Sequence, residues 1–184
     1  MNNYKIYSVS DRYITYLRKQ VPGVYSNKVD IRTHTRKYIG VVYSINGYNY
    51  YIPLSSPKNT DYKIIGGKKV IRKSIVPIMR ITEKNSDGVI ELKGTLRISH
   101  MIPVPSTELT LYDLNNEADL EYKDLVQKEI IFIRKNKNKI KNNVELIYKQ
   151  KINNDETANY VKTALDYKLL EEVCDQFNKV FITN

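Results

Sequence analysis

The dipeptide Asn46-Gly47 constrains the fold more than any other feature, because it separates two runs of apolar and aromatic residues, KYIGVVYSI (37–45) and YNYYIPL (48–54). Asn-Gly accepts the left-handed backbone conformations of a type I′ turn, whose twist matches that of two paired antiparallel strands. The pattern therefore predicts a β-hairpin over 37–54. A chain that contains this hairpin is expected to build an antiparallel sheet around it.

Further strands are predicted on both sides of the hairpin. The stretch 4–9 alternates between polar and apolar residues, as a short strand does. The apolar runs 70–82 and 88–98 flank a turn signature, and Pro77 indicates that the first of them is an edge strand or carries a bulge. The sequence MIPVP (101–105) is expected to lead into a last extended segment.

Helices are predicted near the N-terminus and in the second half of the chain. Ser10 is a suitable N-cap for a helix over 11–20, and apolar residues at helical spacing predict helices over 119–137 and 156–178. The lysine-rich segment 58–69 is expected to be a loop, and the lysine-rich segment 134–143 is expected to be exposed to solvent on most of its faces. The sum is a single α+β domain over 1–184, an antiparallel, barrel-like sheet with three or four helices.

The composition favours a polyanionic partner. Lys and Arg number 30 against 20 Asp and Glu, which gives a net charge of +10, and 16 tyrosines supply flat rings that can stack on bases. The same bias towards Lys, Asn, Ile and Tyr also arises from an AT-rich genome. No apolar run approaches the roughly 18–20 residues of a membrane span, and the first residues lack the apolar core of a signal peptide, so we expect a cytoplasmic protein.

The motifs of nucleotide, dinucleotide and zinc-protease sites are missing from the sequence. The two histidines, His34 and His100, lie far apart, and Cys174, the single cysteine, is expected to be a buried apolar side chain. The acidic residues at 113–121 fit a loop and the start of a helix better than a two-metal centre. We therefore expect no metal and no cofactor.

The remaining functional groups are hydroxyls and cations, which suit chemistry on RNA. The RNA 2′-OH is itself a nucleophile, so an enzyme need only align it, neutralise the phosphate and manage two protons. Suitable side chains occur where strands end and loops begin, namely Tyr13, Arg36, Ser55, Ser56 and Lys58. Taken alone, Ser55-Ser56-Pro57-Lys58 has two interpretations, a turn that ends a strand or a site, because Pro57 stops the strand in both cases.

The chain resembles the ToxN/AbiQ family, the endoribonuclease toxins of type III toxin–antitoxin systems. The resemblance lies in DRYITYL, KYIGVVYSINGYNYYIPLSSPK, ISHMIPVP, YKDLVQKEIIFIRKNKNKI and YKLLEEV, which occur in this order. It covers most of the chain apart from 59–99. It implies an elaborated SH3-like barrel of the kind found in MazF- and Kid-type toxins.

The resemblance also implies an activity and a partner. The activity is sequence-selective, metal-independent cleavage of RNA that leaves a 2′,3′-cyclic phosphate and a 5′-hydroxyl. The partner is an RNA antitoxin, a transcript of tandem repeats that the toxin cuts into pseudoknots, in closed rings of alternating toxin and RNA. No protein antitoxin is expected, and the role is growth control or abortive defence against phage.

By resemblance, the family's site residues fall on Tyr13, Ser55, Ser56, Lys58 and a cation before the hairpin. Arg36 aligns best with that cation, and Lys37, the next residue, is the alternative. Ser56 would orient the 2′-OH with support from Ser55, Lys58 and Arg36 would neutralise the phosphate, and Tyr13 would position the ribose or donate to a phosphoryl oxygen. Other basic residues are expected to follow the RNA backbone: Lys28, Arg32, Lys37, Lys63, Lys68, Lys69, Arg72, Arg134, Lys135 and Lys137.

A second function class fits the same charge and tyrosine content. In a non-catalytic RNA-binding protein, the basic segments would dock a structured RNA, and Ser55-Ser56-Pro57-Lys58 would only end a strand. The basic segments could also be an ordinary solvated surface. Cleavage of RNA by the purified chain distinguishes the two classes.

Overall fold

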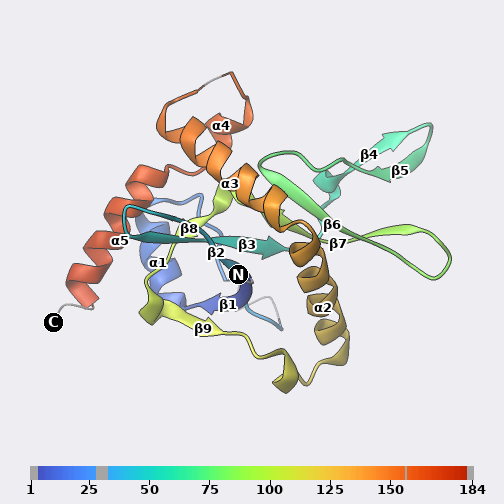
Figure 1. Ribbon diagram of the computed structural model, residues 1–184, viewed down its shortest axis with the longest axis horizontal. Coiled ribbons are helices and arrows are strands. Elements are labelled where there is room, and N and C mark those ends of the chain that lie inside the picture. The colour runs from blue at the N-terminus through green and yellow to red at the C-terminus, as the bar shows by residue number, and fades with distance from the viewer. Residues whose placement is uncertain (1–3, 28–32, 156, 182–184) are drawn as a thin grey trace.

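The computed structural model describes residues 4–27, 33–155 and 157–181 (Figure 1). The strands, in chain order, are β1 (Lys5–Val9), β2 (Lys37–Ile45), β3 (Tyr48–Ser55), β4 (Tyr62–Ile65), β5 (Lys68–Ile71), β6 (Ile78–Lys84), β7 (Ile90–Arg97), β8 (Ile102–Pro103) and β9 (Leu109–Leu111). The α-helices are α1 (Asp11–Gln20), α2 (Leu120–Lys135), α3 (Lys137–Ile152), α4 (Tyr160–Thr163) and α5 (Tyr167–Phe181).

The main sheet is antiparallel, and β3 is its central strand. The strands follow the order β6-β7-β3-β2-β1-β9, and β8 pairs with β3 outside this path. The middle of β3 pairs with β8 through Tyr50 and Tyr51, whereas its end pairs with β7 through Leu54 and Ser55. The strand therefore changes partner just before the Ser-Ser-Pro-Lys segment.

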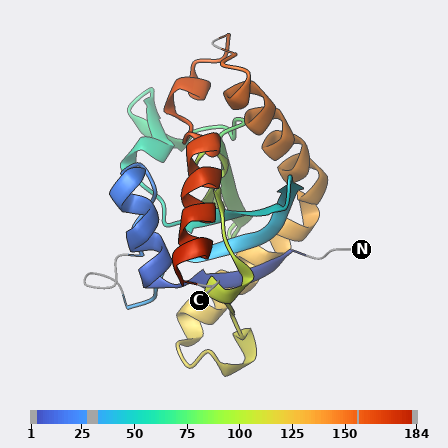
Figure 2. The same ribbon diagram turned by 90° about the vertical axis from the view of Figure 1, so that its left-hand side faces the viewer.

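The helices pack against this sheet and enclose its core. The helices α1 and α5 lie side by side, and α2 and α3 follow one another along the other side of the molecule (Figures 1 and 2). Helix α1 buries Tyr13, Ile14 and Leu17, and its N-cap Ser10 accepts a hydrogen bond from the backbone N–H of Tyr13. These side chains belong to one continuous cluster of buried apolar residues that includes parts of α3, α5 and the sheet.

Several predicted elements are confirmed. The hairpin over 37–54 is β2–β3, with φ of +50° at Asn46 and +85° at Gly47, as a type I′ turn requires. The helix over 11–20 has the predicted bounds, and α2 starts after the N-cap Asp119. Pro77 directly precedes β6, which is an edge strand, and Cys174 is buried. No α-helix of the described residues is long and apolar enough to cross a membrane.

Other expectations were wrong. Among the described residues the sheet is an open path whose ends, β6 and β9, do not pair, so the expected barrel is not closed. The expected loop over 58–69 contains β4, which pairs with β5 in a separate hairpin. The helix expected over 156–178 is divided into α4 and α5. The stretch 134–143 spans the end of α2 and the start of α3 and is mostly exposed, as expected of a solvated stretch. Five α-helices are therefore present in the described residues, where three or four were expected.

Candidate active site

The Ser-Ser-Pro-Lys segment begins at the last residue of β3. Ser55 is buried at 4% exposure and pairs with Thr95 of β7, whereas the next residue, Ser56, is exposed. Pro57 ends the strand, and Lys58 is exposed beyond it. The two hydroxyls therefore differ in environment, because one is held inside the protein and the other is open to solvent.

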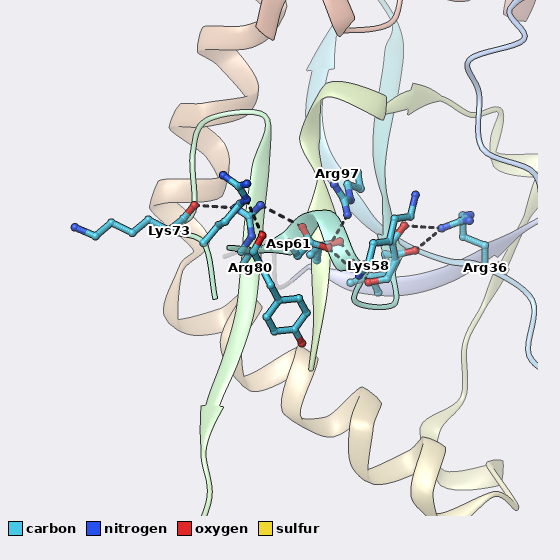
Figure 3. A network of polar contacts seen from close by, with 11 residues as sticks. Arg36, Lys58, Asp61, Lys73, Arg80 and Arg97 are labelled. Atoms are coloured by element: carbon cyan, nitrogen blue, oxygen red, sulfur yellow. Dashed lines mark hydrogen bonds and ion pairs between the residues drawn. The ribbon is translucent and has the colours of Figure 1, made fainter. Parts of the chain in front are cut away.

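Arg36 connects the segment before β2 to the end of β3. Its guanidinium, 4% exposed as a residue, donates to the Leu54 carbonyl at 2.7 Å and to the Ser55 hydroxyl at 2.8 Å (Figure 3). Lys37 lies differently, because its ammonium donates to the Ser8 hydroxyl at 3.0 Å and burial lowers its pKa. Of the two candidate cations, Arg36 is the one that donates to a hydroxyl of the segment, that of Ser55.

Tyr25, which the sequence did not single out, lies between the cations of the site. Its ring centroid is 4.9 Å from the Arg36 guanidinium carbon and 5.3 Å from the Lys58 ammonium. His100 stacks on the same ring at 4.4 Å, and burial, helped by Arg97, Lys58 and Arg36, lowers the pKa of His100 to about 4. The imidazole is therefore neutral at neutral pH and adds no charge beside the cations.

The turn itself is held by Asp61, which is fully buried. Its carboxylate accepts the backbone N–H of Lys58 at 3.0 Å and forms ion pairs with Arg97 at 2.9 Å and Arg80 at 3.2 Å (Figure 3). Arg80 also donates to the Lys73 carbonyl at 2.7 Å. The carboxylate thus connects the start of the 3-10 turn Asn59–Asp61 to β6 and β7.

The hydroxyls face a cavity of about 280 Å³, whose lining includes Arg36, Lys37, Ser55, Ser56 and Lys93. This lining brings cations and hydroxyl groups together at one place. Within the described ranges, no group of three or more His, Cys, Asp or Glu side chains could hold a metal ion. The lining itself offers hydrogen-bond donors and positive charge to a ligand.

Tyr13, which is expected to position the ribose or donate to a phosphoryl oxygen, has its contacts among core residues and does not line the cavity. Its side chain is fully buried, its hydroxyl donates to the Pro103 carbonyl at 2.7 Å, and its ring packs edge-on against Phe177. Burial raises its pKa well above the ordinary value for tyrosine. The structure therefore gives Tyr13 a place in the core, where it connects α1 to β8.

The basic residues predicted to follow RNA occupy separate places. Lys28 and Arg32 lie outside the described residues. Four others are exposed and lie together on or just beyond the β4–β5 hairpin: Lys63, Lys68, Lys69 and Arg72. Arg134 and Lys135 are exposed at the end of α2, and Lys137 starts α3 with its ammonium near the Tyr4 ring.

The chain is similar to known toxins over almost its whole length. It is 28% identical to the endoribonuclease ToxN of Bacillus thuringiensis subsp. kurstaki, over 97% of this chain and 86% of that protein. It is 30% identical to the endoribonuclease AbiQ of Lactococcus lactis subsp. lactis, over 95% of this chain and 90% of that protein.

Solved structures of similar toxins have the same fold. One, from work on selective toxin inhibition by a non-coding RNA pseudoknot in bacterial type III systems, superposes with a TM-score of 0.75 at 29% identity, covering 97% of this chain and 99% of that one. AbiQ, described as a lactococcal anti-phage endoribonuclease of a type III system, superposes with a TM-score of 0.75 at 28% identity and the same coverage.

These likenesses define a class, the toxins of type III toxin–antitoxin systems. The family model of toxin ToxN, type III toxin–antitoxin system, matches residues 5–175. The chain belongs to the ToxN family.

The role of Asp61 predicts the effect of its neutralisation. Asp61→Asn is expected to lower the free energy of unfolding by about 3–5 kcal/mol, because two buried guanidinium groups lose their counter-charge. Urea denaturation measures this difference. The matched control is Asp87→Asn in the exposed β6–β7 turn, where a change within about 0.5 kcal/mol is expected. An unchanged unfolding midpoint for Asp61→Asn would show that the carboxylate does not hold the turn.

The position of Tyr13 predicts a loss of stability without a loss of chemistry. Tyr13→Phe removes the hydrogen bond to Pro103 and is expected to lower the free energy of unfolding by about 1–2 kcal/mol. Cleavage of RNA by the folded variant should stay within a few-fold of wild type. Tyr16→Phe is the control, because that ring also packs on Phe177 and its hydroxyl makes no hydrogen bond to the described residues. A hundredfold slower cleavage by Tyr13→Phe would show that the Tyr13 hydroxyl takes part in catalysis.

Proposed function

We propose that this chain is a sequence-selective, metal-independent endoribonuclease, the toxin of a type III toxin–antitoxin system. The observation that carries the proposal is the arrangement of exposed Ser56 and Lys58 on a turn held by buried Arg36 and Asp61. This arrangement occurs in a chain of the ToxN family, whose named relatives are endoribonucleases.

The proposed reaction is an in-line displacement at phosphorus within the RNA strand. The 2′-oxygen forms a bond to phosphorus, the bond to the 5′-oxygen breaks, and the products are a 2′,3′-cyclic phosphate and a 5′-hydroxyl. One proton leaves the 2′-OH and one is added to the 5′-oxygen, so no proton is gained or lost overall. The protein supplies alignment and a positive environment for the charge that grows on the phosphoryl oxygens.

We assign each side chain a role that fits its position. Ser56, which is exposed, orients the 2′-OH, and Ser55 is held by Arg36 as its support. Lys58, which is exposed, neutralises the charge of the scissile phosphate. Arg36, which is buried beside the Ser55 hydroxyl, adds a second, fixed positive charge. A guanidinium does not release its proton at neutral pH, so Arg36 acts as a charge and not as an acid. Tyr25 positions both cations through its ring.

The proposed partner is an RNA antitoxin of tandem repeats, which the toxin cuts and which then occupies the site as a pseudoknot. One structural relative was solved in work on toxin inhibition by such a pseudoknot, and another in work on a processed non-coding RNA that regulates an antiviral system. We propose that toxin and RNA form a closed ring here, in the cytoplasm, with cellular or phage RNA as the target of the free toxin.

Ser56→Ala is expected to lower the rate of RNA cleavage by about 10²–10³, because it removes one preorganised donor from the transition state. The measurement is cleavage of RNA by the purified protein in excess EDTA, with chemical mapping of the product ends. Wild type should cut without metal and leave cyclic phosphate ends. Ser44→Ala, in the exposed part of the β2–β3 hairpin, is the control and should cut at the wild-type rate.

Two results would contradict the proposal. Cleavage that stops in EDTA and returns with a divalent cation would make the reaction metal-dependent. RNA that is bound tightly by wild type but stays intact would make the chain a non-catalytic RNA-binding protein.

The β4–β5 hairpin is expected to contact RNA phosphates through its exposed lysines. Replacing Lys68 and Lys69 by Ala should reduce the slope of log K against log salt by about 1.4, or 0.7 for each single-strand phosphate that the variant no longer neutralises. Binding of an uncleavable 2′-O-methyl RNA at several salt concentrations measures the slope. The control replaces Lys19 and Lys179, exposed on α1 and α5, in the same way. Equal slopes for both double variants would remove the hairpin from the RNA interface.

A further inference from the structure

The cavity beside the hydroxyls is also lined by residues of α2. Tyr122, Leu125 and Glu129 line it, and their spacing places them on one face of that helix. Leu54 and His34 belong to the same lining. The hydroxyls thus share their cavity with an aromatic, apolar and carboxyl-bearing surface that the proposed cleavage chemistry does not use.

Two stacked rings form part of this surface. The ring of His34 lies 3.7 Å from that of Tyr122, with only 5° between their planes. The His34 Nε2 is 3.0 Å from an Asp119 carboxylate oxygen at the start of α2, and Tyr112 meets Tyr122 edge-on at 6.3 Å. The ring pair is therefore fixed from two directions, as a stacking surface must be.

Glu129 is a polar group deep in this cavity that the protein leaves without a partner. It is 7% exposed, and among the described residues it makes no hydrogen bond and no ion pair. Its carboxyl lies directly over Gly94 of β7, where an added Cβ would be 2.7 Å from Oε1. Lys93, a lysine of the same lining, is paired instead with Glu91 and Glu83.

Burial raises the pKa of Glu129 to about 8, so the carboxyl is mostly protonated at neutral pH. A protonated carboxyl offers one donor and one acceptor side by side. A buried polar group without a protein partner is unfavourable, so its hydrogen bonding calls for a water, an ion or a ligand that completes it. The edge of a nucleobase carries donors and acceptors at this same spacing.

We propose that this cavity binds one nucleobase of the RNA strand, stacked against the His34–Tyr122 ring pair and hydrogen-bonded along its edge by Glu129. The proposal rests on the proposed function, because it places the base next to the phosphate that Ser56 and Lys58 engage. A volume of about 280 Å³ lies below the range of roughly 300–1,000 Å³ that holds drug-sized ligands, so it suits a single ring system. The bound base would fix which phosphate reaches the hydroxyls, and so the register of cleavage.

The test is equilibrium binding of the four 3′-nucleotides and of inorganic phosphate, measured by calorimetry. Wild type is expected to bind at least one 3′-nucleotide about tenfold more tightly than phosphate. Glu129→Leu should reduce that nucleotide affinity by roughly tenfold, because the base edge loses its partner, and leave phosphate affinity unchanged. Replacing an unpartnered buried carboxyl with an apolar side chain should not impair folding.

Two further variants separate hydrogen bonding from packing. Glu129→Gln keeps a donor and an acceptor, so nucleotide binding should stay within about threefold of wild type. Glu172→Leu, an exposed position on α5, is the matched control for introducing leucine and should bind like wild type. Equal affinity of wild type for all 3′-nucleotides and for phosphate would overturn the proposal. So would Glu129→Leu binding nucleotides as tightly as wild type.

The cleavage assay keeps this proposal distinct from the proposed function. If wild type cuts RNA in EDTA but shows no preference for nucleotides over phosphate, the nucleobase site is wrong and the endoribonuclease stands. If wild type binds nucleotides through Glu129 but leaves RNA intact, the site stands on a chain that does not cleave RNA.

Discussion

Asp61 has no exposure to solvent, and its carboxylate lies between guanidinium groups from two neighbouring strands. A buried charge is tolerated only where opposite charge and hydrogen bonds surround it. The Asp61 carboxylate is therefore confined to the position between its guanidinium partners. Because it also accepts the backbone N–H of Lys58, the turn that follows β3 is fixed relative to β6 and β7. This ion cluster, together with the contacts of Arg36 to Leu54 and Ser55, fixes the segment that carries Ser56.

The buried and exposed cations of this protein do different work. Arg36, Arg80 and Arg97 are almost fully buried, and their planar guanidinium groups each satisfy fixed acceptors inside the protein. The lysines of the β4–β5 hairpin are exposed, so solvent or a ligand can reach their ammonium groups. Net charge counts both groups alike, and therefore overstates how much of the positive charge faces a partner.

The local patterns could be predicted from the sequence, and the long-range contacts could not. Asn-Gly, the Ser10 cap and the Ser-Ser-Pro-Lys segment act within a few residues of themselves, so their structures followed from composition and spacing. Asp61 meets Arg97 across 36 residues, and nothing near Asp61 in the sequence indicates this partner. Tyr25 and Glu129 were missed for the same reason. The break between α4 and α5 is also tertiary, because the Leu165 N–H donates to the Ser99 carbonyl.

The ion cluster around Asp61 has a consequence for control of the protein. Because the turn is held by buried contacts before any RNA arrives, binding need not order it, and little entropy is lost there. A regulator cannot then act by loosening the turn without also disturbing the core contacts around it. Under the proposed function, the toxin is most simply inhibited by occlusion, in which the inhibitor covers the active site without changing its structure. Release of the inhibitor would restore activity at once, with no refolding step in between.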